Sequence, residues 1–275
     1  MIKKKNQHII PKCYLKHFQN NKCIVEAYNI DSKRFLENNI ERVCNQNFAY
    51  EVSKKKVDNV LENEIAVLES EMSPYIDNLI SKTLKNEIKR EDINHHILFK
   101  YMTLLHVRTE SNRIQFVRAL FHYESLGHHM SLNELQNNQV YLKLFNAKFK
   151  EKSSLNTFLE FCYDKFQPEV RLGISKTEKF ITSDNPVITF FIPDKENYVG
   201  IKYVLPIHPY ICIYYIASEY KGISKEKQID FPYIVKPETI YGYNQGIINV
   251  ANHWIISSEP FTFLQNNQIS KRFSS

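Results

Sequence analysis

Glycine is scarce in this chain, which has only 6 of them in 275 residues. Glycine-rich turns cradle phosphates in most classical nucleotide-binding folds, so this scarcity argues against Rossmann and P-loop architectures. No apolar run approaches the roughly 20 residues needed to cross a bilayer. None of signal-peptide length follows the lysines near the N-terminus either. We therefore expect a soluble protein with no membrane partner.

The 5 cysteines do not form a recognisable metal or disulfide framework. Their number is odd and no two of them are spaced as in a C-x-x-C pair, so neither a structural zinc site nor a disulfide scaffold is expected. Reduced thiols of this kind fit a cytoplasmic protein.

The remaining composition is that of a globular protein, with 43% hydrophobic and 24% charged residues. The formal net charge is +6 and the pI is about 8.8. This mild excess permits RNA or DNA as a partner without requiring it. A general bias toward lysine and asparagine explains the charge equally well. A partner protein or a homo-oligomer also remains open.

The middle of the chain carries helical patterns. Apolar residues recur at 3.6-residue spacing from Val57 to Leu84, which predicts a long helix with a kink or a break at Pro74. A second long helix is predicted from Glu91 to Ser125, where Gly127 would stop it. Shorter helices are expected over 132–147 and 153–164, with Ser131 and Ser154 as caps.

Strand patterns flank these helices on both sides. An alternating segment at 23–29, a turn at 29–32 and a further strand from Arg34 predict an N-terminal hairpin. Further elements are predicted in the C-terminal part: strands over 170–174, 180–182, 187–191, 203–205, 210–216 and 254–257, and a helix within 236–250.

This segregation of helices from strands predicts an α+β fold. We expect a central bundle of long helices and a mixed, mostly antiparallel sheet. That sheet would be built largely from the C-terminal third plus the N-terminal strands. A single domain over 1–275 is expected, with an N-terminal motif and hairpin (1–55), a helical part (56–165) and a sheet part (166–275).

Two basic side chains are candidates for chemistry. His8 begins a segment that ends at Phe18, and a neutral imidazole can act as base, acid or metal ligand near neutral pH. The alternative is a capped N-terminal helix in which His8 is incidental. Arg108 lies among apolar neighbours in the second long helix. It would need a carboxylate or a phosphate as a partner. Its simplest structural partner is a glutamate of the preceding helix.

Acidic side chains supply the other candidates. Glu62 and Glu69 are seven residues apart, so they point the same way from a helix and could bind a divalent cation. The alternative is a solvated charged face. A polar turn from Thr182 to Pro186 joins two strands. We expect it to expose Asp184 and Asn185, unless they serve only as an Asx-turn.

Taken together, these segments resemble a bacterial family of unknown function, the domain-of-unknown-function family 4238. The resemblance covers nearly the whole chain. It rests on the order and spacing of five segments, which here are His8 to Phe18, Ile24 to Tyr28, Leu61 to Glu69, Arg108-Thr109 and Thr182 to Pro186. The family pattern usually has proline after the Arg-Thr pair and glutamine two residues before that arginine. Here Glu110 and His106 stand at those positions. The resemblance implies a shared site but no reaction.

Two functional hypotheses follow from these residues. In the first, the protein is a hydrolase that cleaves nucleic acid, and it would serve as an antiphage-defence or toxin effector. Glu62, Glu69 and Asp184 would hold Mg²⁺ or Mn²⁺, with His8 as base, Arg108 on a phosphate and Asn185 orienting the ligand. In the second, the protein binds nucleic acid or a partner without catalysis, and its polar cluster is a structural network.

Overall fold

The computed structural model describes residues 6–53, 55, 57–122, 130–194, 197–217 and 231–261. Within these residues, α-helices and three mostly antiparallel sheets form an α+β fold, which confirms the predicted class. The expected end of the second long helix at Ser125 and its stop at Gly127 lie outside the described residues. No helix in the described part of the chain is long and apolar enough to cross a membrane.

The largest sheet is built from the C-terminal part of the chain. Its five strands lie in the order β10-β5-β9-β8-β7, and all neighbours are antiparallel except β10 and β5. The sheet is therefore mixed and mostly antiparallel, as the strand pattern predicted. Its strands are β5 (Arg171–Ile174), β7 (Ile188–Asp194), β8 (Asn197–His208), β9 (Ile211–Ala217) and β10 (Tyr233–Ile234).

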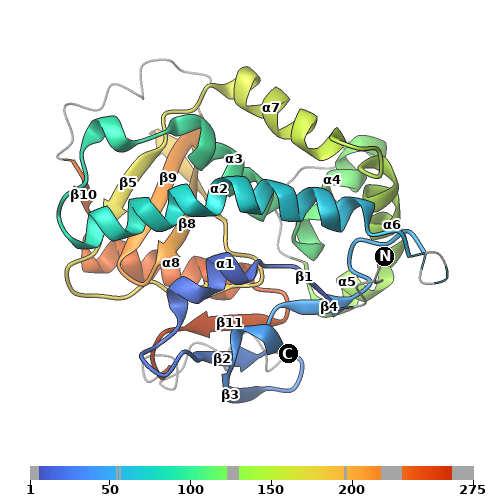
Figure 1. Ribbon diagram of the computed structural model, residues 1–275, viewed down its shortest axis with the longest axis horizontal. Helices are drawn as coiled ribbons and strands as arrows, with labels where there is room; N and C mark the ends of the chain where they lie inside the picture. Colours follow the sequence, from blue (N-terminus) through green and yellow to red (C-terminus); the bar gives the residue numbers. More distant parts are fainter. Residues whose placement is uncertain are drawn as a thin grey trace.

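Both faces of this sheet are buried. Side chains of successive strand residues point to opposite faces, so Val204 and Leu205 of β8 enter two different apolar clusters. On one side lie α2 (Val60–Leu84), α3 (His95–Val107) and α7 (Ser154–Phe166). On the other side lies α8 (Pro237–Val250), which contacts β7 and β6. Figure 1 shows α2 crossing the molecule in front of the strands.

A smaller sheet joins the two ends of the chain. Its four strands lie in the order β3-β2-β11-β6, at the bottom of Figure 1. The predicted N-terminal hairpin is confirmed, and β2 pairs with β11 from the C-terminal part. These strands are β2 (Val25–Asn29), β3 (Arg34–Asn38), β6 (Thr182–Ser183) and β11 (Trp254–Ser257). A third sheet pairs β1 (Asn6–His8) with β4 (Asn45–Asn47).

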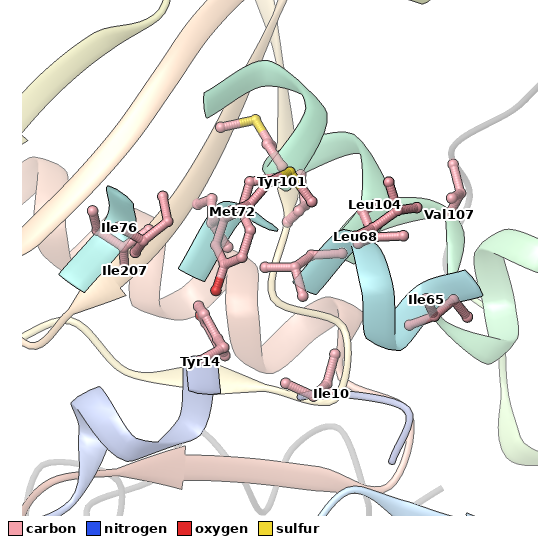
Figure 2. Packing of buried hydrophobic residues seen from close by; sticks show 14 of the residues in the cluster. Ile10, Tyr14, Ile65, Leu68, Met72, Ile76, Tyr101, Leu104, Val107 and Ile207 are labelled. Carbon is pink, nitrogen blue, oxygen red and sulfur yellow. The ribbon is translucent and has the colours of Figure 1, made fainter. Parts of the chain in front are cut away.

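The N-terminal segment packs beneath α2. Helix α1 (Lys12–Leu15) is short and continues as a 3-10 turn at Lys16–Phe18. Figure 2 shows Ile10 and Tyr14 pointing toward Leu68, Met72 and Tyr101. The apolar face predicted for α2 is buried here, and Pro74 lies inside one uninterrupted helix without ending it. Other 3-10 turns are at Ile40–Arg42 and Arg90–Asp92.

The prediction of one long helix from Glu91 to Ser125 was wrong. Helix α3 ends at Val107 and α4 (Glu110–His122) begins after a break at Arg108 and Thr109. The carbonyl of His106 accepts hydrogen bonds from the side chains of Thr109 (3.2 Å) and Asn112 (2.8 Å). Polar side chains thereby compete with the main-chain N–H that would extend the helix. A central bundle of long helices is consequently not confirmed.

The shorter helices mostly follow the sequence pattern. The segment predicted over 132–147 is divided into α5 (Leu132–Asn137) and α6 (Gln139–Lys148). Ser131 caps α5 as predicted, since its side chain accepts from the Glu134 N–H. The predicted cap at Ser154 was wrong, because Ser153 is the residue at the N-cap of α7 and makes no side-chain cap hydrogen bond.

Candidate functional site

Arg108 is buried at the break between α3 and α4, with 2% of its surface exposed. All three of its nitrogen atoms donate hydrogen bonds inside the fold. Nε donates to the Tyr50 hydroxyl at 3.0 Å, Nη1 to the Glu69 carboxylate, and Nη2 to the His8 carbonyl at 2.5 Å. The glutamate of the preceding helix is thus its partner, as the sequence predicted. Burial lowers the pKa of Arg108, but Tyr50 and Glu69 outweigh this effect and hold that pKa above its ordinary value.

A second arginine lies next to this cluster and was not singled out from the sequence. The Arg113 side chain is fully buried and donates from Nη1 to the Ala49 carbonyl at 2.6 Å and to the Asn146 side chain at 3.1 Å. The Tyr50 ring faces both guanidinium groups. Its centroid lies 5.7 Å from Cζ of Arg108 and 5.1 Å from Cζ of Arg113. The sequence signal was a second arginine in the same polar stretch, within the residues that follow Arg108-Thr109.

A cavity of about 320 Å³ lies between the N-terminal segment and α2. His8, Glu62, Glu69 and Arg108 all line it, so the structure brings four of the predicted residues together. Burial, Lys12 and Arg108 lower the pKa of His8 to about 4. The His8 imidazole is therefore neutral near pH 7. Its Nδ1 is buried and makes no hydrogen bond within the described residues.

Asp184 does not line that cavity. It is 2% exposed, which corrects the expectation that the turn would expose it. Its Oδ1 accepts from the Asn252 N–H at 2.8 Å and its Oδ2 from the His253 N–H at 2.7 Å. Burial raises the pKa of Asp184 by more than His253 and these main-chain donors lower it, so this pKa lies above its ordinary value. The two main-chain N–H groups before β11 offset the cost of removing this carboxylate from water, and Asp184 can therefore be buried.

The expected metal set is therefore divided between two places. Glu62 and Glu69 line the cavity, while both oxygens of Asp184 are used by main-chain donors elsewhere. In the part of the chain that the structure describes, no three His, Cys, Asp or Glu side chains form a group that could hold a metal ion.

Asn185 is also buried, at 5% exposed, and lies beside a different cavity. Its side-chain oxygen accepts from Asn112 at 3.2 Å, and its nitrogen donates to the Val250 carbonyl at 3.0 Å. This second cavity, about 400 Å³ in volume, lies among α3, α4, α7 and the strands β7, β8 and β9. The chain has 17 Tyr and 18 Phe, and nothing in their sequence spacing indicates that several of them gather at this cavity.

The N-terminal motif and the polar turn nevertheless meet in the core. The Tyr14 hydroxyl lies 2.6 Å from the Thr182 hydroxyl and donates to the Pro206 carbonyl at 2.6 Å. Tyr14 is fully buried. Two segments separated by 168 residues are thus joined by a hydrogen bond between side chains that do not reach solvent.

One family matches residues 6–260, and it is described as "Protein of unknown function (DUF4238)". The chain belongs to this family. No match was found among curated proteins or among solved structures. Membership of DUF4238 therefore agrees with the resemblance seen in the five sequence segments and assigns no reaction.

Proposed function

We propose that this DUF4238 protein binds nucleic acid without catalysis, and that its cluster around Arg108 belongs to the scaffold. The proposal rests on one observation: the three guanidinium nitrogens of Arg108 all donate hydrogen bonds within the fold. A phosphate could be held by Arg108 only if some of these buried hydrogen bonds were broken. Doing so would leave Glu69 or Tyr50 without its partner, which is costly.

The buried Asp184 supports the same proposal. Both of its oxygens accept main-chain hydrogen bonds, so the carboxylate links the polar turn to the segment before β11. A metal ion would have to displace these donors. The net charge of +6 is consistent with an anionic partner such as RNA or DNA. The five free cysteines are compatible with a cytoplasmic location, which belongs to the same proposal.

Fluorescence anisotropy with labelled RNA and DNA oligonucleotides tests this function. Binding should weaken as salt rises, because cations return to the phosphates when the protein leaves. The oligonucleotide should remain full-length on a denaturing gel after incubation with Mg²⁺ or Mn²⁺. Absence of binding at low salt would contradict the proposal. Affinity that does not change with salt would also contradict it and would favour a partner protein or a second copy of the chain.

A hydrolase acting on nucleic acid is the second candidate, and one observation favours it. His8, Glu62 and Glu69 line the same cavity, and His8 is neutral near pH 7 and able to accept a proton. Glu62 and Glu69 would supply carboxylate ligands to Mg²⁺ or Mn²⁺, which would activate water for phosphodiester cleavage. A defence or toxin effector would be of this kind.

Cleavage of tRNA or plasmid in the presence of Mg²⁺ or Mn²⁺ separates the two candidates. Under the hydrolase hypothesis, Glu62→Gln should abolish cleavage while the protein stays folded by circular dichroism. Glu71→Gln, at an exposed position of the same helix, is the matched control and should leave cleavage unchanged. Wild-type protein that leaves both substrates intact with either metal would rule the hydrolase out.

A further inference from the structure

Seven of the residues that line the 400 Å³ cavity are Phe or Tyr. Phe99 of α3, Phe158 of α7 and Tyr203 of β8 line it, together with Phe116, Phe166 and Tyr215. Tyr203 and Tyr215 are stacked, with ring centroids 4.8 Å apart and planes 9° from parallel. A cavity of this size and lining is typical of a site for a small organic molecule.

Two of the aromatic rings in the cavity wall are largely exposed. Phe166, at the end of α7, is 60% exposed, and Phe191, on β7, is 59% exposed. The apolar surface of an exposed phenylalanine is unfavourable in water. A flat ligand that covers these rings would remove that surface from water and so be stabilised. The two exposed rings come from different elements, so we infer that the cavity opens between α7 and the edge strand β7.

Two polar side chains of the cavity, Asn112 and His106, hold each other in place. The Asn112 amide nitrogen donates to the His106 carbonyl at 2.8 Å and lies 3.1 Å from His106 Nδ1 and 3.2 Å from Asn185 Oδ1. These three contacts of the amide nitrogen fix the orientation of the Asn112 side chain. Its oxygen accepts no hydrogen bond within the described residues and is left for a ligand.

His106 supplies the complementary donor. Burial lowers its pKa to about 4, so the ring is neutral near pH 7. The Asn112 amide nitrogen can only donate, so its contact with Nδ1 fits the tautomer that carries the single ring proton on Nε2. None of the described residues that line the cavity is charged. The cavity therefore presents an acceptor and a donor between aromatic walls, and no group that would pair with an ion.

We propose that this cavity binds an uncharged, flat nitrogen heterocycle of the nucleobase type. Every nucleobase has π faces that stack on aromatic side chains and an edge that carries hydrogen-bonding groups. Proteins that take a base out of its stack hold it in the same way, between apolar rings and against a few polar groups. A base of a bound strand would depend on the proposed nucleic-acid function, whereas a free nucleoside would not.

Isothermal titration calorimetry with the four ribonucleosides and with RNA pentamers tests the inference. Wild-type protein should bind at least one nucleoside with saturation. Phe166→Ser should weaken that binding about tenfold or more, since stacking of one base on one ring has an effect of this size. Phe161→Ser is the matched control, because Phe161 is also on α7, is 65% exposed and does not line the cavity. Phe191→Ser, in the part of the cavity wall formed by β7, should weaken nucleoside binding in the same way and gives a second, independent test.

The outcomes separate this inference from the proposed function. Pentamers that bind with salt dependence, but equally well to the Phe166→Ser and Phe161→Ser variants, would overturn the cavity assignment and leave nucleic-acid binding in place. Nucleosides that bind while oligonucleotides do not would support the cavity and contradict the proposed function. Lack of saturable binding by any nucleoside or pentamer would overturn the inference.

Discussion

The imidazole of His253 is held between Glu110 and Asp31, with Nε2 2.9 Å from Glu110 Oε2 and Nδ1 2.9 Å from Asp31 Oδ2. Glu110 begins α4 directly after Arg108-Thr109, and Asp31 lies in the turn of the N-terminal hairpin. Burial lowers the pKa of His253, but Glu110, Asp184 and Asp31 outweigh that effect and raise it to about 10. His253 is therefore charged near neutral pH and joins the small sheet to the helices.

This arrangement predicts stability that decreases in mild alkali. The ordinary pKa of histidine is about 6.5, and the folded value is about 10. A group whose pKa is raised by folding stabilises fully below its unfolded pKa and loses that contribution as pH rises through its folded pKa. The free energy of unfolding should therefore fall between about pH 6.5 and pH 10.

Urea unfolding of the wild type and of His253→Gln at half-unit pH steps measures this effect. The variant should be less stable than the wild type at pH 6.5, and the difference should shrink toward pH 10. A difference that stays constant over this range would show that the charge of His253 does not stabilise the fold.

Removal of the Arg108 side chain should destabilise the protein strongly. Arg108→Met would leave the half-buried Glu69 beside the cavity without its cation and the buried Tyr50 hydroxyl without its donor. Removing one partner of a fully buried ion pair costs about 3–5 kcal/mol, and the partial exposure of Glu69 places the expected loss near the lower end of that range. Urea unfolding at pH 7 measures the change. Arg34→Met, on the exposed face of β3, is the control and should change stability by less than about 0.5 kcal/mol. A loss below about 1 kcal/mol for Arg108→Met would contradict the scaffold role.

Much of the fold could be predicted from the sequence because hydrophobic periodicity is local. The buried face of α2 and the N-terminal hairpin both follow directly from such patterns. The break at Arg108 was missed, because it depends on which side chains reach the His106 carbonyl. Periodicity cannot distinguish two consecutive helices from one when the apolar pattern continues across the junction.

The candidate site was only partly predictable for a related reason. The pairing of Arg108 with a glutamate follows from the cost of burying an unpaired guanidinium. The burial of Asp184 does not follow, since its partners are main-chain N–H groups 68 and 69 residues away. Main-chain donors are the same at every position, so a sequence does not indicate which of them a carboxylate will meet. The aromatic cavity was missed because its walls come from helices and strands that are distant in the chain.

The buried hydroxyl of Tyr14 should contribute measurably to stability. Tyr14→Phe removes the bond to Thr182 and the donor to the Pro206 carbonyl, and both of these partners are inaccessible to solvent water. Leaving buried polar groups without partners costs about 1–3 kcal/mol. Thermal unfolding followed by circular dichroism would measure the loss. Tyr233→Phe, at a half-buried ring, is the control and should have little effect. An unchanged melting temperature for Tyr14→Phe would show that these contacts do not stabilise the core.

Substitution of Asp184 by asparagine distinguishes a scaffold from a catalytic carboxylate. An amide has one acceptor oxygen, so Asp184→Asn would turn an NH₂ group toward the N–H of Asn252 or His253. It would also remove a negative charge close to the His253 imidazolium. Hydrogen bonds to a charged group contribute about 1.5–3 kcal/mol, so the free energy of unfolding should fall by about 2 kcal/mol. Asp77→Asn, which breaks a half-exposed pair with Lys16, should cost less than about 1 kcal/mol. Oligonucleotide affinity of the folded Asp184→Asn protein should equal that of the wild type at low temperature. Unchanged stability together with lost cleavage of RNA or DNA would instead assign Asp184 to catalysis.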